Sequence, residues 1–215
     1  MKKIILVGAS STACEQLYNN YNKKYHFIRM SRNIEFSDFK DFDVLDTKTY
    51  ANIEDNIDGL VYFPGTINLK QFQRIKISDF QTDFNINVLG LINILQYYHN
   101  QFNNGSSIVL FSTVASKLGM PFHSSIAISK SAIVGLMQSL AAEWAPKIRV
   151  NCISPSIFES NMSQRMLSNE KSLERISNNH PLKRVGNPND ISSAINFLLS
   201  HESSWITGQD IRKQK

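Results

Sequence analysis

The segment Ser107-Ile-Val-Leu-Phe-Ser-Thr113 opens the part of the chain that decides the fold. It is followed by Ile126-Ala-Ile-Ser-Lys130, by an amphipathic run that ends at Trp144, and by Ile148-Arg-Val-Asn-Cys-Ile-Ser-Pro155. The first and last of these segments are short apolar runs, which are typical of buried strands. The run between them has apolar residues at helical spacing. A strand, a helix that carries a lysine and a second strand together predict an α/β unit with a parallel sheet.

The remainder of the chain repeats this alternation of strands and helices. Between Asn33 and Asp41 the chain is too short for a crossover helix and another strand, so we expect one α/β unit to be trimmed after the second strand. The sequence predicts one α/β domain over residues 1–215, with a Rossmann-like doubly wound parallel sheet. The further strands are expected at Ile4–Val7, Tyr25–Met30, Gly59–Phe63 and Gly208–Ile211, and the further helices at Ser10–Asn20, Thr47–Ile57 (weakly), Ile77–Phe102 and Pro188–Ser200.

Composition narrows the class of protein. Of the 215 residues, 42% are hydrophobic and 19% are charged, and no apolar run approaches the roughly 20 residues of a membrane span. Cys14 and Cys152 fall in predicted core elements, which favours buried thiols and a cytoplasmic location. The net charge of +5 is spread along the chain, so we expect an anionic small molecule and neither nucleic acid nor a membrane as partner.

Ligands of doubly wound sheets bind beyond the carboxyl ends of the strands. Those ends are expected at Gly8, Ser31, Pro64-Gly65, Ser112-Thr113 and Ser154-Pro155. Most of the residues suited to binding or chemistry lie at these ends, so the sequence predicts the functional site there.

Several motifs resemble the short-chain dehydrogenases/reductases, over nearly the whole chain. They are Asn87-Val-Leu-Gly, the spacing of Thr113 and Lys130-Ser-Ala, the strand that ends at Pro155, and Pro181-Leu-Lys-Arg-Val-Gly followed by Trp-Ile-Thr-Gly. The chain is most similar to the β-ketoacyl-carrier-protein reductase-like branch. The resemblance implies hydride transfer between a nicotinamide dinucleotide and a small carbonyl or alcohol substrate.

The glycine loop of that family is altered here. The pattern Thr-Gly-x-x-x-Gly-x-Gly corresponds to Val7-Gly8-Ala-Ser-Ser-Thr12-Ala-Cys14. Gly8 can still form the tight turn, but Thr12 places a branched side chain where the backbone approaches the pyrophosphate. Ser10, Ser11 and Thr12 offer hydroxyls at a helix N-terminus, which suits an anion; the alternative is that they only cap the helix.

Further cofactor contacts follow from the resemblance. The Asn-Asn-Ala-Gly of the family is Tyr62-Phe63-Pro64-Gly65 here, and its Pro-Gly is Pro155-Ser156. Pro64, Gly65, Pro155 and Ser156 are therefore expected to border the cofactor, whereas Tyr62 and Phe63 are expected to pack.

The choice of cofactor depends on the end of the second strand. Ser31-Arg32 stands where an acidic residue would accept the ribose hydroxyls, and Arg32 can pair with a 2′-phosphate. We therefore expect NADP(H) rather than NAD(H), with a solvated surface arginine as the alternative. The resemblance assigns Asp43 to the adenine edge; the alternative is a turn or capping role.

The catalytic residues of the family are only partly present. By resemblance, Lys130 binds the nicotinamide ribose, Asn87 anchors a water in the proton relay, and Thr113, beside Ser112, donates to the substrate carbonyl. The proton-donating tyrosine, four residues before the lysine, is replaced by Ile126, which has no proton to give. No metal site is predicted.

His123 is a candidate replacement for the tyrosine. On a helix, His123, Ile126 and Lys130 stand at i, i+3 and i+7 and share a face. Imidazole is suited to proton transfer near neutral pH. A cap or surface role for His123 is the alternative.

Three functions remain open. The first is an NADP(H)-dependent reductase with an atypical proton donor. The second is an inactive dinucleotide-binding homologue that acts as a sensor or assembly partner, and the third is a structural subunit without cofactor. Residues 157–181 are expected to form a substrate lid whose inner or docking face holds Met162, Met166 and Leu167. The resemblance implies a homodimer or homotetramer through Ile77–Phe102 and Ser124–Trp144.

Overall fold

The computed structural model describes residues 1–38, 42–53 and 56–213. Over these residues six parallel strands form one sheet in the order β2-β1-β3-β4-β5-β6. This arrangement confirms the single-domain, doubly wound α/β fold, because the order reverses between β1 and β3. The strands are β1 (Lys2–Val7), β2 (Tyr25–Met30), β3 (Ile57–Tyr62), β4 (Phe102–Phe111), β5 (Ile148–Pro155) and β6 (Asp210–Lys213).

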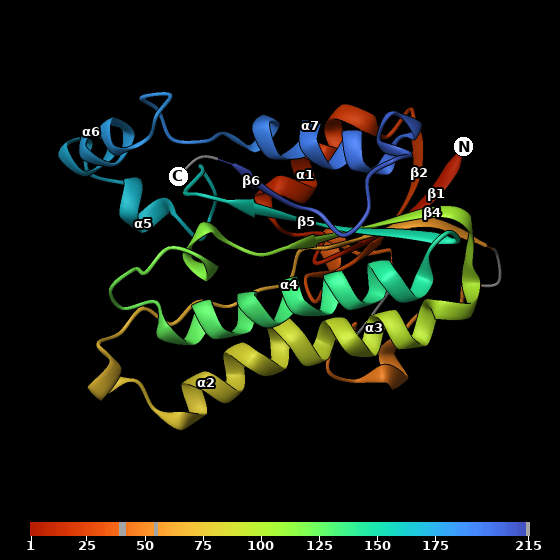
Figure 1. The fold of residues 1–215 in the computed structure, drawn as a ribbon, viewed down its shortest axis with the longest axis horizontal. Helices are drawn as coiled ribbons and strands as arrows, with labels where there is room; N and C mark the ends of the chain where they lie inside the picture. Colours follow the sequence, from red (N-terminus) through yellow and green to blue (C-terminus); the bar gives the residue numbers. More distant parts are fainter. Residues whose placement is uncertain (39–41, 54–55, 214–215) are drawn as a thin grey trace.

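Helices cover both faces of the sheet (Figure 1). α1 (Thr12–Tyr21) and α7 (Pro188–Leu199) lie on one face, and α2 (Ile77–Phe84), α3 (Gly90–Tyr98) and α4 (Ser124–Trp144) lie on the other. A separate apolar core fills each side. α4 has the length and hydropathy of a membrane span, but its buried side chains, including Ile133 and Met137, join the core beneath the sheet. It is packed as a core helix.

The trimmed unit leaves β2 at the edge of the sheet. Between β2 and β3 the described residues hold only two short 3₁₀ turns, Ile34–Phe36 and Thr47–Thr49. The predicted helix at Thr47–Ile57 is therefore wrong over its described part, and residues 54 and 55 lie outside the described ranges. The apolar spacing there reflects packing of Tyr50 and Ile53 into the core from an irregular segment.

The outer edge of β2 is occupied by the chain that follows it. Arg29 N–H donates to the Asp38 carboxylate at 2.8 Å, and Asp38 N–H donates to the Arg29 carbonyl at 2.9 Å. The Arg29 guanidinium also pairs with Asp38 at 2.9 Å. Both outward-facing backbone groups of Arg29 are thus satisfied without another strand.

The predicted long helix at Ile77–Phe102 is interrupted. A π-helical turn, Asn85–Leu89, separates α2 from α3, and Phe102 already begins β4. The Tyr62 hydroxyl donates to the Ile86 carbonyl at 2.7 Å, and a Cβ on Gly90 would lie 2.8 Å from that hydroxyl. Gly90 therefore gives Tyr62 room to enter the turn, which confirms a packing role for Tyr62.

Candidate active site

Lys130 is buried in the middle of the site. It lies on α4 with 8% exposure, and its ammonium donates to the Phe111 carbonyl at the end of β4 at 3.1 Å. Burial lowers the pKa of Lys130 from 10.5 to about 8, and the charge of Asp83 opposes that change. The Cys152 thiol on β5 also faces this amine; burial raises its pKa to about 12, so it stays neutral.

Gly65 brings Lys130 and Asn87 together. A Cβ built on Gly65 would lie 3.1 Å from Asn87 Oδ1 and 3.6 Å from Lys130 Nζ. Asn87 is fully buried in the π-helical turn, and its Nδ2 donates to the Asp83 carbonyl at 2.7 Å. Its Oδ1 has no hydrogen-bond partner among the described residues. Because a buried amide oxygen without a partner is costly, this arrangement has an acceptor left open for a water or a ligand hydroxyl.

The two hydroxyls after β4 have different surroundings. Ser112 is buried and donates to the Lys130 carbonyl at 2.9 Å, so it fixes α4 to the sheet. Thr113 is partly exposed, and its Oγ1 accepts from Ala115 N–H at 3.3 Å. Accepting that bond leaves the Thr113 proton available to a ligand.

The position of the missing tyrosine is closed and apolar. Ile126 is 4% exposed on α4, one turn before Lys130. His123 occupies the N-cap of α4 without a side-chain cap bond, and its Nδ1 lies 2.6 Å from the Pro121 carbonyl. A carbonyl only accepts, so Nδ1 carries the hydrogen and Nε2 is left as the free ring nitrogen. No hydrogen bond joins His123 to Thr113 or Lys130 in the described part of the chain.

The turn after β1 is tight and leads directly into α1. Gly8 has φ +79°, and a Cβ on it would lie 2.9 Å from the Pro64 ring. Ser11 is the N-cap of α1 and accepts from Cys14 N–H at 3.2 Å, while Ser10 is partly exposed beside it. Thr12 Oγ1 accepts from Asn161 N–H at 3.3 Å.

That last contact joins the altered glycine loop to the segment after β5. Ser11 caps α1, as the alternative interpretation of these hydroxyls predicted. Thr12 instead holds the two loops together across the start of α1.

The residues predicted to bind the adenosine part of the cofactor lie in the segment that follows β2. Ser31 is buried and accepts from Asn33 N–H at 3.1 Å. Arg32 is exposed and has no hydrogen bond or ion pair with a described residue. Asp43 accepts from Leu45 N–H at 2.9 Å, which is a local turn. Of the three, Arg32 is the side chain left available to a ligand.

Residues 157–181, the predicted lid segment, are anchored at both ends. Gly186 N–H donates to the Ile157 carbonyl at 3.1 Å, and Glu159 N–H donates to the Gly186 carbonyl at 3.0 Å. Next to Pro155, which ends β5, the Ser156 hydroxyl lies 2.8 Å from Nε2 of buried His180. Residues 157–181 therefore leave and re-enter the domain at one place.

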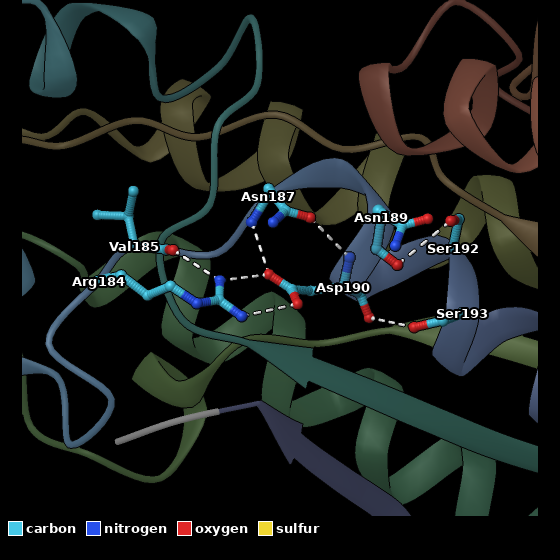
Figure 2. A network of polar contacts seen from close by, with 7 residues as sticks. All are labelled: Arg184, Val185, Asn187, Asn189, Asp190, Ser192 and Ser193. Atoms are coloured by element: carbon cyan, nitrogen blue, oxygen red, sulfur yellow. Dashed lines mark hydrogen bonds and ion pairs between the residues drawn. The ribbon is translucent and has the colours of Figure 1, made fainter.

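A polar network fixes the chain after the lid to α7 (Figure 2). Arg184 makes two bonds to the Asp190 carboxylate, at 2.6 and 2.9 Å. Asp190 and Asn187 form a capping box at the start of α7, with Asn187 N–H donating to Asp190 at 2.8 Å. The predicted first-turn position of Asp190 is confirmed.

Two helices that the sequence did not predict lie within the lid segment. They are α5 (Gln164–Leu167) and α6 (Glu170–Asn179), and Figure 1 shows them beyond the end of the sheet at which β6 ends. Met162 is 56% exposed and Met166 is 39% exposed. These methionines do not form a docking face onto the core, so that interpretation is wrong for this conformation.

Two polar residues of the site were missed from the sequence. Asp83 is fully buried one turn before Asn87, and His180 binds Ser156 from the end of α6. An acidic residue at i−4 from Asn87 on the same helix was the available signal for Asp83. His180 had no comparable signal, because its contact depends on how the lid returns to the domain.

The comparisons with known proteins agree with the observed fold. The family model described as "Enoyl-(Acyl carrier protein) reductase" matches residues 7–213. The 3-oxoacyl-[acyl-carrier-protein] reductase of Thermotoga maritima is 35% identical over 72% of this chain and 63% of its own length. That of Aquifex aeolicus is 27% identical over 97% of this chain and 84% of its own. The chain belongs to the short-chain dehydrogenase/reductase family.

Solved structures show the same fold at lower identity. A short-chain dehydrogenase family protein from Francisella tularensis subsp. tularensis SCHU S4 has a TM-score of 0.86 and 23% identity, over 99% of this chain and 96% of its own. A small-chain dehydrogenase in complex with NADPH has a TM-score of 0.86 and 22% identity, over 98% and 95%. A 4-hydroxyisoleucine dehydrogenase complexed with NADH has a TM-score of 0.84 and 22% identity, over 99% and 97%.

Proposed function

We propose that this protein is an NADP(H)-dependent oxidoreductase that interconverts a small carbonyl compound and its alcohol. The observation that carries the proposal is the convergence of Lys130 Nζ and Asn87 Oδ1 on Gly65, because a buried ammonium and an unpartnered amide oxygen together suit a ribose hydroxyl. A purely structural subunit would gain nothing from a desolvated lysine.

The residues present fit a dinucleotide. Gly65 leaves space where any side chain would collide with Asn87, and the start of α1 offers backbone N–H groups beside the Ser10 and Ser11 hydroxyls. Arg32 is exposed and suited to a 2′-phosphate. The relatives named as reductases and the neighbours bound to NADPH and NADH support a nicotinamide dinucleotide as the cofactor. Thr12, which stands where the family has a glycine, places a branched side chain toward the expected pyrophosphate position.

The chemistry needs a hydride and a proton. Bound NADPH supplies the hydride to the carbonyl carbon, and a proton must reach the carbonyl oxygen. Thr113 donates a hydrogen bond to that oxygen, and Lys130 and Asn87 hold the ribose. His123 is the proposed acid: because Nδ1 donates to the Pro121 carbonyl, the proton would leave from Nε2 of the doubly protonated imidazolium once the lid and substrate are in place. Ile126 excludes water from this part of the site.

Fluorescence titration with NADPH tests binding directly. Lys130→Met should weaken binding at least tenfold, because it removes the ribose ligand. Lys147→Met, which changes an exposed lysine in the turn between α4 and β5, should bind like the wild type. Wild-type protein that leaves NADPH fluorescence unchanged at millimolar cofactor would overturn the proposal.

An inactive dinucleotide-binding homologue is the second candidate. It is favoured by the burial of Ile126 at the proton donor's position. In that case NADPH would bind with the expected dependence on Lys130, while a panel of aldehydes and ketones would leave the absorbance at 340 nm unchanged.

Self-association through α2, α3 and α4 is part of the proposal. Apolar side chains on these helices are exposed, and a hollow of about 240 Å³ between α2 and α4 is lined in part by Phe80, Phe84 and Ile128. A second copy of the chain would cover this face. Ile128→Asp should lower the mass measured by light scattering. We also propose a cytoplasmic location, in keeping with the two unpaired cysteines.

A further inference from the structure

Asp83 has a buried carboxylate, and the proposed reaction gives this group no role. Asp83 has no exposed surface and lies at the end of α2. Three donors reach its carboxylate: Thr66 Oγ1 at 2.6 Å, Asn68 Nδ2 at 3.0 Å and Ser125 Oγ at 2.6 Å. All three are neutral, so the negative charge has no hydrogen-bonded cation in the described part of the chain.

These contacts join three segments of the active site. Thr66 and Asn68 follow Gly65, and Ser125 lies in the first turn of α4, next to Ile126. Asn87 Nδ2 donates to the backbone carbonyl of Asp83 at 2.7 Å and to Thr66 Oγ1 at 3.4 Å, the same hydroxyl that donates to the Asp83 carboxylate, and Asn87 Oδ1 faces Gly65. One residue thus fixes the loop after β3, the amide of Asn87 and the start of the lysine-bearing helix.

The charge of Asp83 acts on Lys130. The titratable groups that face the Lys130 amine are Asp83 on α2 and Cys152 on β5, and the thiol is neutral at physiological pH. Asp83 therefore supplies the negative charge that favours the ammonium form in surroundings that otherwise disfavour it. Without a tyrosine at position 126, no phenol contributes there.

We propose that Asp83 is a positioning residue of the active site, which orients Asn87 and keeps Lys130 cationic for binding the cofactor ribose. The binding of the cofactor ribose by the Lys130 ammonium rests on the proposed function. The effect of the Asp83 charge on Lys130 belongs to the protein without cofactor and can be measured in its absence.

The test is an NMR titration of the Lys130 ammonium in ¹⁵N-lysine-labelled protein without cofactor, assigned by its loss in Lys130→Met. In Asp83→Asn the midpoint should fall by roughly half a unit or more, since an opposite charge is lost. The matched control is Asp79→Asn, one turn earlier on α2, whose carboxylate pairs with Lys70 at 2.7 Å. This control should titrate like the wild type.

A second variant serves if Asp83→Asn does not fold. Asp83→Ser keeps a small side chain that can bond to the same neighbours but removes the charge, so the Lys130 midpoint should again fall. A folded Asp83→Asn or Asp83→Ser variant with the wild-type midpoint would overturn the inference. Failure of the wild type to bind NADPH would overturn the proposed function and leave this measurement standing.

Discussion

Lys130 Nζ and the carbonyl oxygen of Phe111 are joined by a hydrogen bond of 3.1 Å, so a helix side chain is tied to the last residue of a sheet strand. The bond holds the amine at the carboxyl edge of the sheet, where a doubly wound fold binds ligands. It does not fully compensate for burial, because the pKa of Lys130 remains lowered to about 8.

Lys130→Met should stabilise the fold while it weakens cofactor binding. The folded protein holds its lysine proton less tightly than the unfolded chain, whose lysine has a pKa near 10.5. Below about pH 8 the lysine is protonated in both the folded and the unfolded state, so the folded state bears the full cost of burying the ammonium. As pH rises from about 8 to 10.5, this cost disappears. At pH 7 we expect a gain of roughly 1–3 kcal/mol in the free energy of unfolding.

Urea denaturation of wild type and Lys130→Met at pH 7 and pH 10.5 measures this difference. The gap between the two proteins should be largest at pH 7 and should narrow at the higher pH. A variant less stable than the wild type at pH 7 would contradict the prediction.

Ile126→Tyr should create or raise carbonyl reductase activity. The phenol would restore a proton donor one turn from Lys130, and a positioned acid contributes about 10²–10⁴-fold to the rate. NADPH oxidation with a panel of small ketones provides the measurement. Asn19→Tyr, on the exposed side of α1 and away from the proposed self-association face, is the control and should leave the rate unchanged. Equal rates in all three proteins would mean that the substrate pocket itself is absent.

Thr12→Gly should tighten NADPH binding about tenfold, or about 1.4 kcal/mol, because the backbone can then approach the pyrophosphate. Glycine also removes the Thr12–Asn161 contact and costs about 1 kcal/mol in the first turn of α1. Calorimetric titration checks the affinity. Thr12→Ser keeps the hydroxyl and should fall between the two. Weaker binding by Thr12→Gly would show that the lid contact matters more than the approach of the backbone.

Arg32→Glu should reverse the preference for the phosphorylated cofactor. A charge-assisted bond contributes about 1.5–3 kcal/mol, so NADPH should bind about 10- to 100-fold more weakly, with little loss for NADH. Paired titrations with both cofactors give the ratio. Lys23→Glu, which changes the charge equally at the opposite end of β2, should leave the ratio intact. An unchanged ratio in Arg32→Glu would assign Arg32 to the surface.

Much of the fold could be predicted because its signals are local. The apolar strands and the bounds of α4 follow from periodicity, and the burial of Lys130 follows from its place on a core-facing helix. The π-helical turn could not be predicted, since it depends on Tyr62 reaching Ile86 from another strand. α5 and α6 carry too few apolar residues for a clear pattern, and Thr47–Ile57 has apolar spacing without a helix.

The candidate site also contains residues that sequence motifs identify and residues that only the tertiary structure reveals. Lys130, Asn87 and Gly65 were identified from motifs, and the structure brings them together. The partners that set their orientation, Asp83 and Phe111, act through tertiary contacts that sequence spacing does not encode. The role of His123 stays a prediction, since it depends on a substrate.

The pairing of Asp38 with Arg29 affects how the edge of this sheet can interact with neighbouring protein molecules. Losing an outer strand normally exposes a row of unsatisfied amides and carbonyls, which can recruit a neighbouring molecule into a growing fibril. Here the segment that ends at Asp38 folds back along that edge, so the backbone groups of Arg29 are not available to a strand of a neighbouring molecule.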